Sequence, residues 1–114
     1  MHELGIIVHI TKTLQSVAKE NHLNEIGSVT LEVGEVSSIV LDYLTDCWAY
    51  YRKKFPLIEK AEMKIEILPA VTYCEACGKT YPTVHYGRQC PHCGSWDTYL
   101  AAGDECNIRE IEAD

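Results

Sequence analysis

The spacing of apolar residues predicts two amphipathic helices. In residues 3–21 apolar side chains recur every three to four positions, and polar side chains take the other side. The apolar positions of this helix are Leu4, Ile7, Ile10, Leu14 and Val17. A second helix is predicted at residues 39–54, and Pro56 is expected to end it. Its expected apolar face consists of Ile39, Tyr43, Cys47, Tyr50 and Tyr51.

Other segments alternate between apolar and polar residues with a period of two. This pattern in residues 28–33 and 62–68 predicts half-buried strands. The inward side chains of the second segment are Met63, Ile65 and Ile67. Residues 98–112 return to strand character around a Gly103-Asp104 turn, with Ile108 and Ile111 as apolar anchors.

These elements predict an α+β fold: two helices packed on a small mixed β-sheet, with an inserted four-cysteine, zinc-ribbon-like domain. The first domain would be discontinuous. It would comprise residues 1–69, be interrupted by a zinc-binding domain at 70–97, and be completed by return strands in 98–114.

The inserted segment carries two Cys-x-x-Cys pairs. Two thiolates separated by two residues sit on one tight turn, or knuckle, and two knuckles supply the four sulfurs that tetrahedral zinc takes in a structural site. A glycine follows each pair, and glycine readily takes the positive φ that such a turn needs. The predicted zinc ligands are Cys74, Cys77, Cys90 and Cys93.

Charge and composition narrow the class of protein. The formal net charge of the 114-residue chain is −7. In residues 70–97, Lys79 and Arg88 balance Glu75 and Asp97, so the knuckles lack the basic face that nucleic acid requires. No apolar run is long enough for a membrane span, and the first residues do not resemble a signal peptide. We therefore expect a cytoplasmic protein that uses neither nucleic acid nor membrane as its partner; a reducing cytosol also preserves thiolates.

A second candidate site lies at Met1-His2-Glu3. A free α-amine, the His2 amide and imidazole nitrogens, and the Glu3 amide can surround one ion in a plane. That geometry is preferred by Cu(II) and low-spin Ni(II) rather than by zinc. The site requires that Met1 be retained and that its amine be free. A histidine at position 2 is common, however, and does not by itself identify a nickel site.

The order of motifs along the whole chain resembles one family, the hydrogenase nickel-incorporation proteins HypA/HybF. The matching motifs are Met1-His2-Glu3-Leu4, Leu31-Glu32-Val33-Gly34-Glu35, Cys74-Glu75-Ala76-Cys77-Gly78, Cys90-Pro91-His92-Cys93-Gly94-Ser95 and Ile108-Arg109-Glu110-Ile111-Glu112. Cys106 departs from the pattern, because family members more usually have a larger hydrophobic residue there.

The resemblance implies a nickel metallochaperone rather than an enzyme. Such a protein would bind Ni(II) through Met1, His2 and Glu3 and keep structural Zn(II) on its four cysteines. It would deliver nickel to the large subunit of [NiFe]-hydrogenase, together with a nickel-binding GTPase; some relatives also serve urease maturation. The Glu3 carboxylate would tune or orient the nickel site.

Other interpretations of the same residues remain open. The alternative function is a zinc-ribbon module for protein interaction or nucleic-acid binding, without nickel delivery. Redox-active dithiols fit poorly, because two zinc-spaced pairs are present. His9, His85 and His92 are expected to be ordinary surface or partly packed histidines. Cys47 and Cys106 are expected to be small buried hydrophobic residues.

Overall fold

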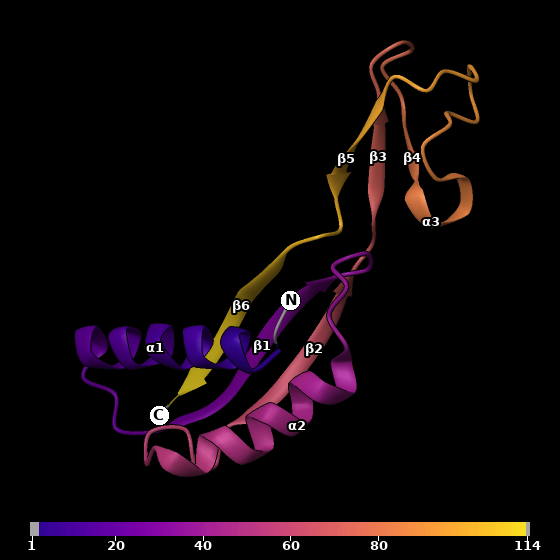
Figure 1. Cartoon of the computed structure of the whole chain (residues 1–114). Helices are drawn as coiled ribbons and strands as arrows, with labels where there is room; N and C mark the ends of the chain where they lie inside the picture. Colours follow the sequence, from indigo (N-terminus) through magenta and orange to yellow (C-terminus); the bar gives the residue numbers. More distant parts are fainter. Residues whose placement is uncertain (1–2, 114) are drawn as a thin grey trace. The chain divides into compact units, whose positions relative to one another are not determined.

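The computed structural model describes residues 3–113, which form two compact units (Figure 1). Unit 1 comprises residues 3–32, 38–66 and 107–113. Unit 2 comprises residues 33–37 and 67–106. Within residues 3–113, no helix has the length and apolar character needed to cross a membrane.

Unit 1 is built from two helices and a three-stranded sheet with the strand order β2-β1-β6. Its elements are α1 (Glu3–Asn21), β1 (Ile26–Gly34), α2 (Leu41–Tyr51), the 3-10 helix η1 (Arg52–Lys54), β2 (Glu62–Leu68) and β6 (Cys106–Ala113). The arrows in Figure 1 show β1 and β2 running in one direction and β6 in the other. Helices α1 and α2 pack against each other. The predicted α+β fold with a mixed sheet is thus confirmed.

Hydrogen bonds at the strand ends support these directions. The amide of Glu35, just beyond β1, donates to the carbonyl of Leu68 at the end of β2 (2.9 Å), so the two strands end together. At the start of β1, the Ser28 hydroxyl donates to Glu112 near the end of β6 (2.7 Å). The helix predicted at residues 3–21 and the strand predicted at 62–68 have the predicted bounds.

The apolar face predicted for the second helix is wrong at Tyr43 and Tyr50 and omits the two residues that are buried. Leu44 and Trp48 are its buried residues, whereas Tyr43 and Tyr50 are 62% and 65% exposed. Trp48 can be buried because its indole N–H donates to the carbonyl of Ala61 (2.9 Å). The tyrosines, by contrast, keep their hydroxyl groups in water.

Strand β1 is buried over nearly its whole length, although its alternating pattern predicted a half-buried strand. It is the central strand of the sheet, so a neighbouring strand lies on each side of it. Ion pairs between the two outer strands must cross it: Lys64 with Glu112 (3.0 Å) and Arg109 with Glu66 (2.7 Å). Glu112 also accepts a hydrogen bond from the Ser28 hydroxyl, and Ser28 is only 5% exposed. A polar residue on β1 therefore did not mark a solvated face.

The outer strands are less buried than predicted. Met63 and Ile65 are half-buried as expected, but Ile67 is 50% exposed. In β6 both Ile108 and Ile111 are half-buried although they lie three residues apart. The regular alternation is therefore interrupted between them, as a β-bulge would do.

Unit 2 contains an antiparallel sheet with the order β4-β3-β5. Its elements are β3 (Val71–Cys74), β4 (Thr80–Pro82), α3 (Thr83–Tyr86) and β5 (Thr98–Ala102). Tyr99 of β5 pairs with Tyr73 of β3, and their rings lie 5.4 Å apart. Residues 98–106 therefore lie in this unit, whereas the sequence predicted that the return to the first domain begins at 98.

Candidate metal centre

Four cysteine side chains converge in unit 2. The Sγ atoms of Cys74, Cys77, Cys90 and Cys93 all lie within 4.8 Å of one another. The Sγ atoms of Cys74 and Cys93 are 3.6 Å apart, and those of Cys77 and Cys90 are 3.7 Å apart. Four sulfurs bound to one tetrahedral zinc at about 2.3 Å stand about 3.8 Å from each other. The cluster therefore has the donor atoms and the spacing of a four-thiolate zinc site.

Two knuckles with the same backbone hydrogen bonds hold these thiols. In the first, the amide of Gly78 donates to the carbonyl of Cys74 (2.8 Å), and the amide of Cys74 donates to Lys79 (2.9 Å). In the second, Gly94 donates to Cys90 (2.8 Å), and Cys90 donates to Ser95 (2.9 Å). Both glycines have positive φ, 73° and 75°, as predicted.

The surroundings favour negative charge on the buried Cys90 sulfur. Burial raises the pKa of this thiol, but the backbone N–H groups of Cys93 and His92, together with the neighbouring thiols, outweigh burial and lower the pKa of Cys90 to about 7. The amide of His92 lies 3.4 Å from Cys90 Sγ. Amide donors stabilise a thiolate in the same way whether it is free or bound to a metal.

The exposed Cys93 thiol behaves in the opposite way. The amide of Ser95 favours its thiolate, but burial and hydrogen bonds with the other three thiols dominate and raise the pKa of Cys93 to about 12. Four adjacent thiolates repel one another, so full deprotonation requires a cation among them. The donor set is therefore suited to a divalent metal ion.

The side chains of the histidines near the cluster are not among its candidate ligands. His85 lies on α3 with its ring 6.2 Å from that of Tyr86, and both His85 and His92 are exposed. Neither belongs to the ligand group found among the described residues. Their predicted role as surface histidines agrees with this placement. His9 is likewise exposed on α1.

At the other candidate site, Met1 and His2 lie outside the described residues. Glu3 is the first residue of α1, and its carboxylate accepts a hydrogen bond from the amide of Val40 (3.2 Å), the residue that precedes α2. No sequence motif marks Val40 as a partner of Glu3. The described structure therefore places the Glu3 side chain beside the start of the second helix.

The two remaining cysteines differ from their predicted burial. Cys47 on α2 and Cys106 at the start of β6 are half-buried rather than fully buried. Burial still raises the pKa of the Cys106 thiol, which favours its neutral form. Neither residue is near enough to join the four-cysteine cluster.

The chain combines a small α+β unit with two Cys-x-x-Cys knuckles that together supply four thiols. This combination defines a class of metal-binding proteins with a structural ribbon. The family model described as "Hydrogenase/urease nickel incorporation, metallochaperone, hypA" matches residues 1–113. The chain belongs to this HypA family. Because it is a family of metallochaperones and maturation factors, the expectation that the chain is not an enzyme is confirmed.

Individual relatives agree with this assignment. The hydrogenase maturation factor HypA of Actinobacillus succinogenes is 31% identical over 111 residues, which is 97% of each chain. That of Chlorobium phaeobacteroides is 32% identical over 111 residues, again 97% of each. The solution structure of the nickel metallochaperone HypA from Helicobacter pylori has a TM-score of 0.77 at 21% identity and covers 99% of this chain and 97% of that one. This last similarity concerns the fold.

Proposed function

We propose that this protein binds Ni(II) at its N-terminus and delivers it to the large subunit of [NiFe]-hydrogenase during maturation. The ligands would be the Met1 amine, the His2 amide and imidazole, and the Glu3 amide. Membership of a nickel-incorporation family supports the cargo. The same description includes urease, so urease maturation proteins are proposed as further partners.

The observation that carries the proposed function is the match of the nickel-incorporation family model to residues 1–113, a range that includes Met1-His2-Glu3. An α-amine, an imidazole and amide nitrogens that can surround one ion in a plane suit low-spin Ni(II).

The Glu3 carboxylate has a different proposed role. Because it accepts a hydrogen bond from the Val40 amide, it fixes the first turn of α1 against the start of α2. We therefore assign it to orienting the chelate rather than to binding nickel. Its loss should weaken nickel binding only slightly, while loss of the His2 imidazole removes a ligand.

We assign Zn(II) to Cys74, Cys77, Cys90 and Cys93, where it would cross-link the two knuckles. Four thiolates close the coordination shell, so this metal would remain while nickel is transferred. The thiolates also require a reducing compartment, which supports a cytoplasmic protein. A nickel-binding GTPase is the proposed partner in the transfer.

Nickel titration of four zinc-loaded proteins tests the N-terminal site: native chain, His2→Ala, a chain with Gly-Ser before Met1, and the control His9→Ala. We expect at least a 100-fold loss of affinity in the second and third and no change in the control. Affinity should also fall as pH falls, because the amine and amide ligands must lose protons. Equal affinity in all four proteins would overturn the site.

Delivery is tested separately in cells that lack their own copy of this protein. The native chain should restore hydrogenase activity, and His2→Ala should not unless excess nickel is supplied. Restoration by His2→Ala at low nickel would favour the alternative, a ribbon that acts by binding partners without carrying nickel.

A further inference from the structure

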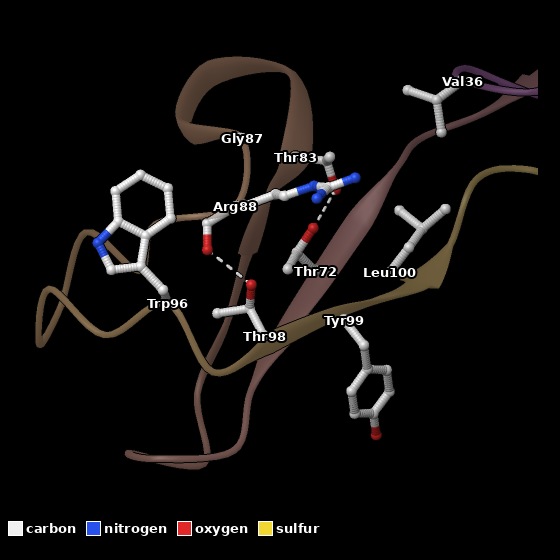
Figure 2. Close-up of a pocket in the computed structure, with 9 residues that line it drawn as sticks. All are labelled: Val36, Thr72, Thr83, Gly87, Arg88, Trp96, Thr98, Tyr99 and Leu100. Atoms are coloured by element: carbon white, nitrogen blue, oxygen red, sulfur yellow. Dashed lines mark hydrogen bonds between the residues drawn. The ribbon is translucent and has the colours of Figure 1, made fainter.

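Unit 2 has a groove on one face of its sheet, separate from the four cysteines (Figure 2). Its volume is about 580 Å³. The floor comes from β3 and β5, whose Thr72 and Leu100 are register partners, and a wall comes from the turn that follows α3. The lining residues are Val36, Thr72, Thr83, Gly87, Arg88, Trp96, Thr98, Tyr99 and Leu100.

Of the described residues that line the groove, Arg88 is the only charged one. Among residues 3–113, no carboxylate forms an ion pair with it. Its backbone is held in place, because the Thr98 hydroxyl donates to the Arg88 carbonyl (2.6 Å). An arginine whose backbone is held in place and whose guanidinium has no ion-pair partner is suited to bind a carboxylate through two hydrogen bonds.

Two threonine hydroxyls add a polar spot to the same face. Those of Thr72 and Thr83 lie 2.6 Å apart, and Figure 2 shows them on the same side of the strand as Arg88. Only one hydroxyl of such a pair donates to the other, so the second proton is available to an acceptor. Both the guanidinium and this proton favour an anionic group over a cation.

The rest of the groove is apolar and accessible. Trp96 is 69% exposed and Leu100 is 38% exposed. Figure 2 shows Trp96 and Leu100 at opposite ends of the groove. Tryptophan and arginine are the residue types most often found as energetic anchors of protein–protein contacts. An exposed tryptophan beside an unpaired arginine therefore indicates a binding surface for another chain.

We propose that this groove binds a peptide segment of a partner protein that carries a carboxylate next to a large apolar side chain. The carboxylate would bind Arg88 and the Thr72–Thr83 hydroxyls, and the apolar side chain would pack on Trp96 or Leu100. The occupant is a peptide rather than a nucleic acid, because the segment 70–97 has no excess of basic residues and four metal-bound thiolates add negative charge. The inference concerns unit 2 and needs no nickel.

The test selects peptides from a random 12-residue display library on the whole zinc-loaded protein. Selected peptides should be enriched in Asp or Glu adjacent to Leu, Ile, Phe or Trp. For the strongest peptide, calorimetry should show at least a tenfold loss of affinity with Arg88→Gln, with Trp96→Ala, or when its acid is replaced by the amide. Added salt should weaken binding to the native chain.

Matched controls separate the groove from the unit as a whole. Lys79→Gln removes the other cation of the ribbon, and Val84→Ala trims an exposed apolar side chain outside the groove. Both should bind within twofold of the native chain. Amide NMR spectra of all variants must superimpose outside the mutated region, which excludes unfolding as the cause of a loss.

Three results would overturn the proposal. One is selection of no peptide whose binding depends on Arg88. Another is tighter binding of single-stranded RNA than of any peptide at physiological salt. The third is a dimer in sedimentation that Trp96→Ala dissociates, since the occupant would then be a second copy of this chain.

Discussion

Among single residues, Gly34 has the least room for a side chain. A Cβ atom there would overlap the backbone carbonyl of Gly103 and lie 2.7 Å from the amide nitrogen of Asp104. Hydrogen bonds keep these backbones close: Gly34 donates to Glu105 (2.7 Å), and Val36 donates to Gly103 (2.8 Å). The close approach of two backbone segments therefore depends on glycine at this position.

We predict that Gly34→Ala lowers the free energy of unfolding by about 3 kcal/mol, because the backbone must move or break these bonds. Denaturant unfolding of the metal-loaded protein measures the change. Gly27→Ala on the same strand is the control, since its Cβ would lie 3.6 Å from the Glu112 carbonyl, an ordinary contact. Equal unfolding midpoints for the two variants would show that the backbone at Gly34 is not in close contact with the backbone of Gly103.

At the scale of elements, the outer face of the unit 1 sheet is covered by charged side chains that span its central strand. Glu112 is the best connected of them, because it accepts from both Ser28 and Lys64 (2.7 and 3.0 Å). The Ser28 hydroxyl and the Lys64 ammonium lower the pKa of the Glu112 carboxyl. Deprotonated Glu112 is therefore favoured by the folded state.

Because the folded pKa lies below the unfolded one, this contribution is present above the unfolded pKa, about 4.3, and is lost as pH falls through the folded pKa. We predict that Glu112→Gln lowers the melting temperature at pH 7 by on the order of 2 °C, since the pair is exposed. The difference from the native chain should shrink as pH falls below about 4.3 and through the lowered folded pKa of Glu112. Glu110→Gln on the same strand should have little effect at pH 7 or below; an equal effect would point to net charge rather than to these contacts.

Element positions were more predictable than buried faces. Apolar spacing located α1 and β2 correctly, because a helix or strand that buries one side must repeat at its own period. The α2 stripe was wrong because tyrosine counts as apolar in a pattern yet keeps its hydroxyl in water, as at Tyr43. The burial of Ser28 on β1 depends on charged residues about 40 and 80 positions away, which no local pattern contains.

For the whole molecule, the two units differ in what holds them together. Unit 1 has a conventional apolar core; its largest fully buried apolar side chains are Ile7, Leu14, Ile26, Val29, Leu31, Leu44 and Ile58. Among residues 3–113, the apolar cluster at the four-cysteine site contains only Cys74, Cys77, Cys90 and Tyr81. Most of that cluster consists of cysteines, so a metal ion bound to them, as proposed, would supply the cross-link that a larger core would otherwise provide.

We predict that removal of zinc by a strong chelator loosens unit 2 and leaves the helices of unit 1 folded. Lys79 and Arg88 are the only trypsin sites between Lys64 and Arg109, so cleavage after them reports on unit 2. Cleavage should accelerate at least tenfold, while the helical circular dichroism falls little. The metal-loaded double variant Cys47→Ser/Cys106→Ser is the control and should resist trypsin as the native chain does. If the metal-free native chain were as resistant to trypsin as the metal-loaded one, the prediction would be contradicted.

The convergence of the four cysteines was predictable, since Cys-x-x-Cys spacing is a local property and two such knuckles need only to meet. The hydrogen bond between Glu3 and Val40 and the groove around Arg88 were not, because each joins residues that are distant in the sequence and have no shared motif. The boundary of unit 2 at residue 106 was not predicted either. Strand β5 belongs to this unit because its backbone pairs with that of β3, and backbone pairing leaves no mark in the side-chain pattern.

The position of β6 affects the order in which the protein can fold during synthesis. This strand is the third of the unit 1 sheet and follows every other strand in the chain. The sheet of unit 1 therefore cannot be completed until β6 has left the ribosome, after all four cysteines have been translated. Synthesis that stalls within unit 2 would leave β1 as an edge strand with one side unpaired and Ser28 without Glu112, so an arrested chain would present an open sheet edge to other chains.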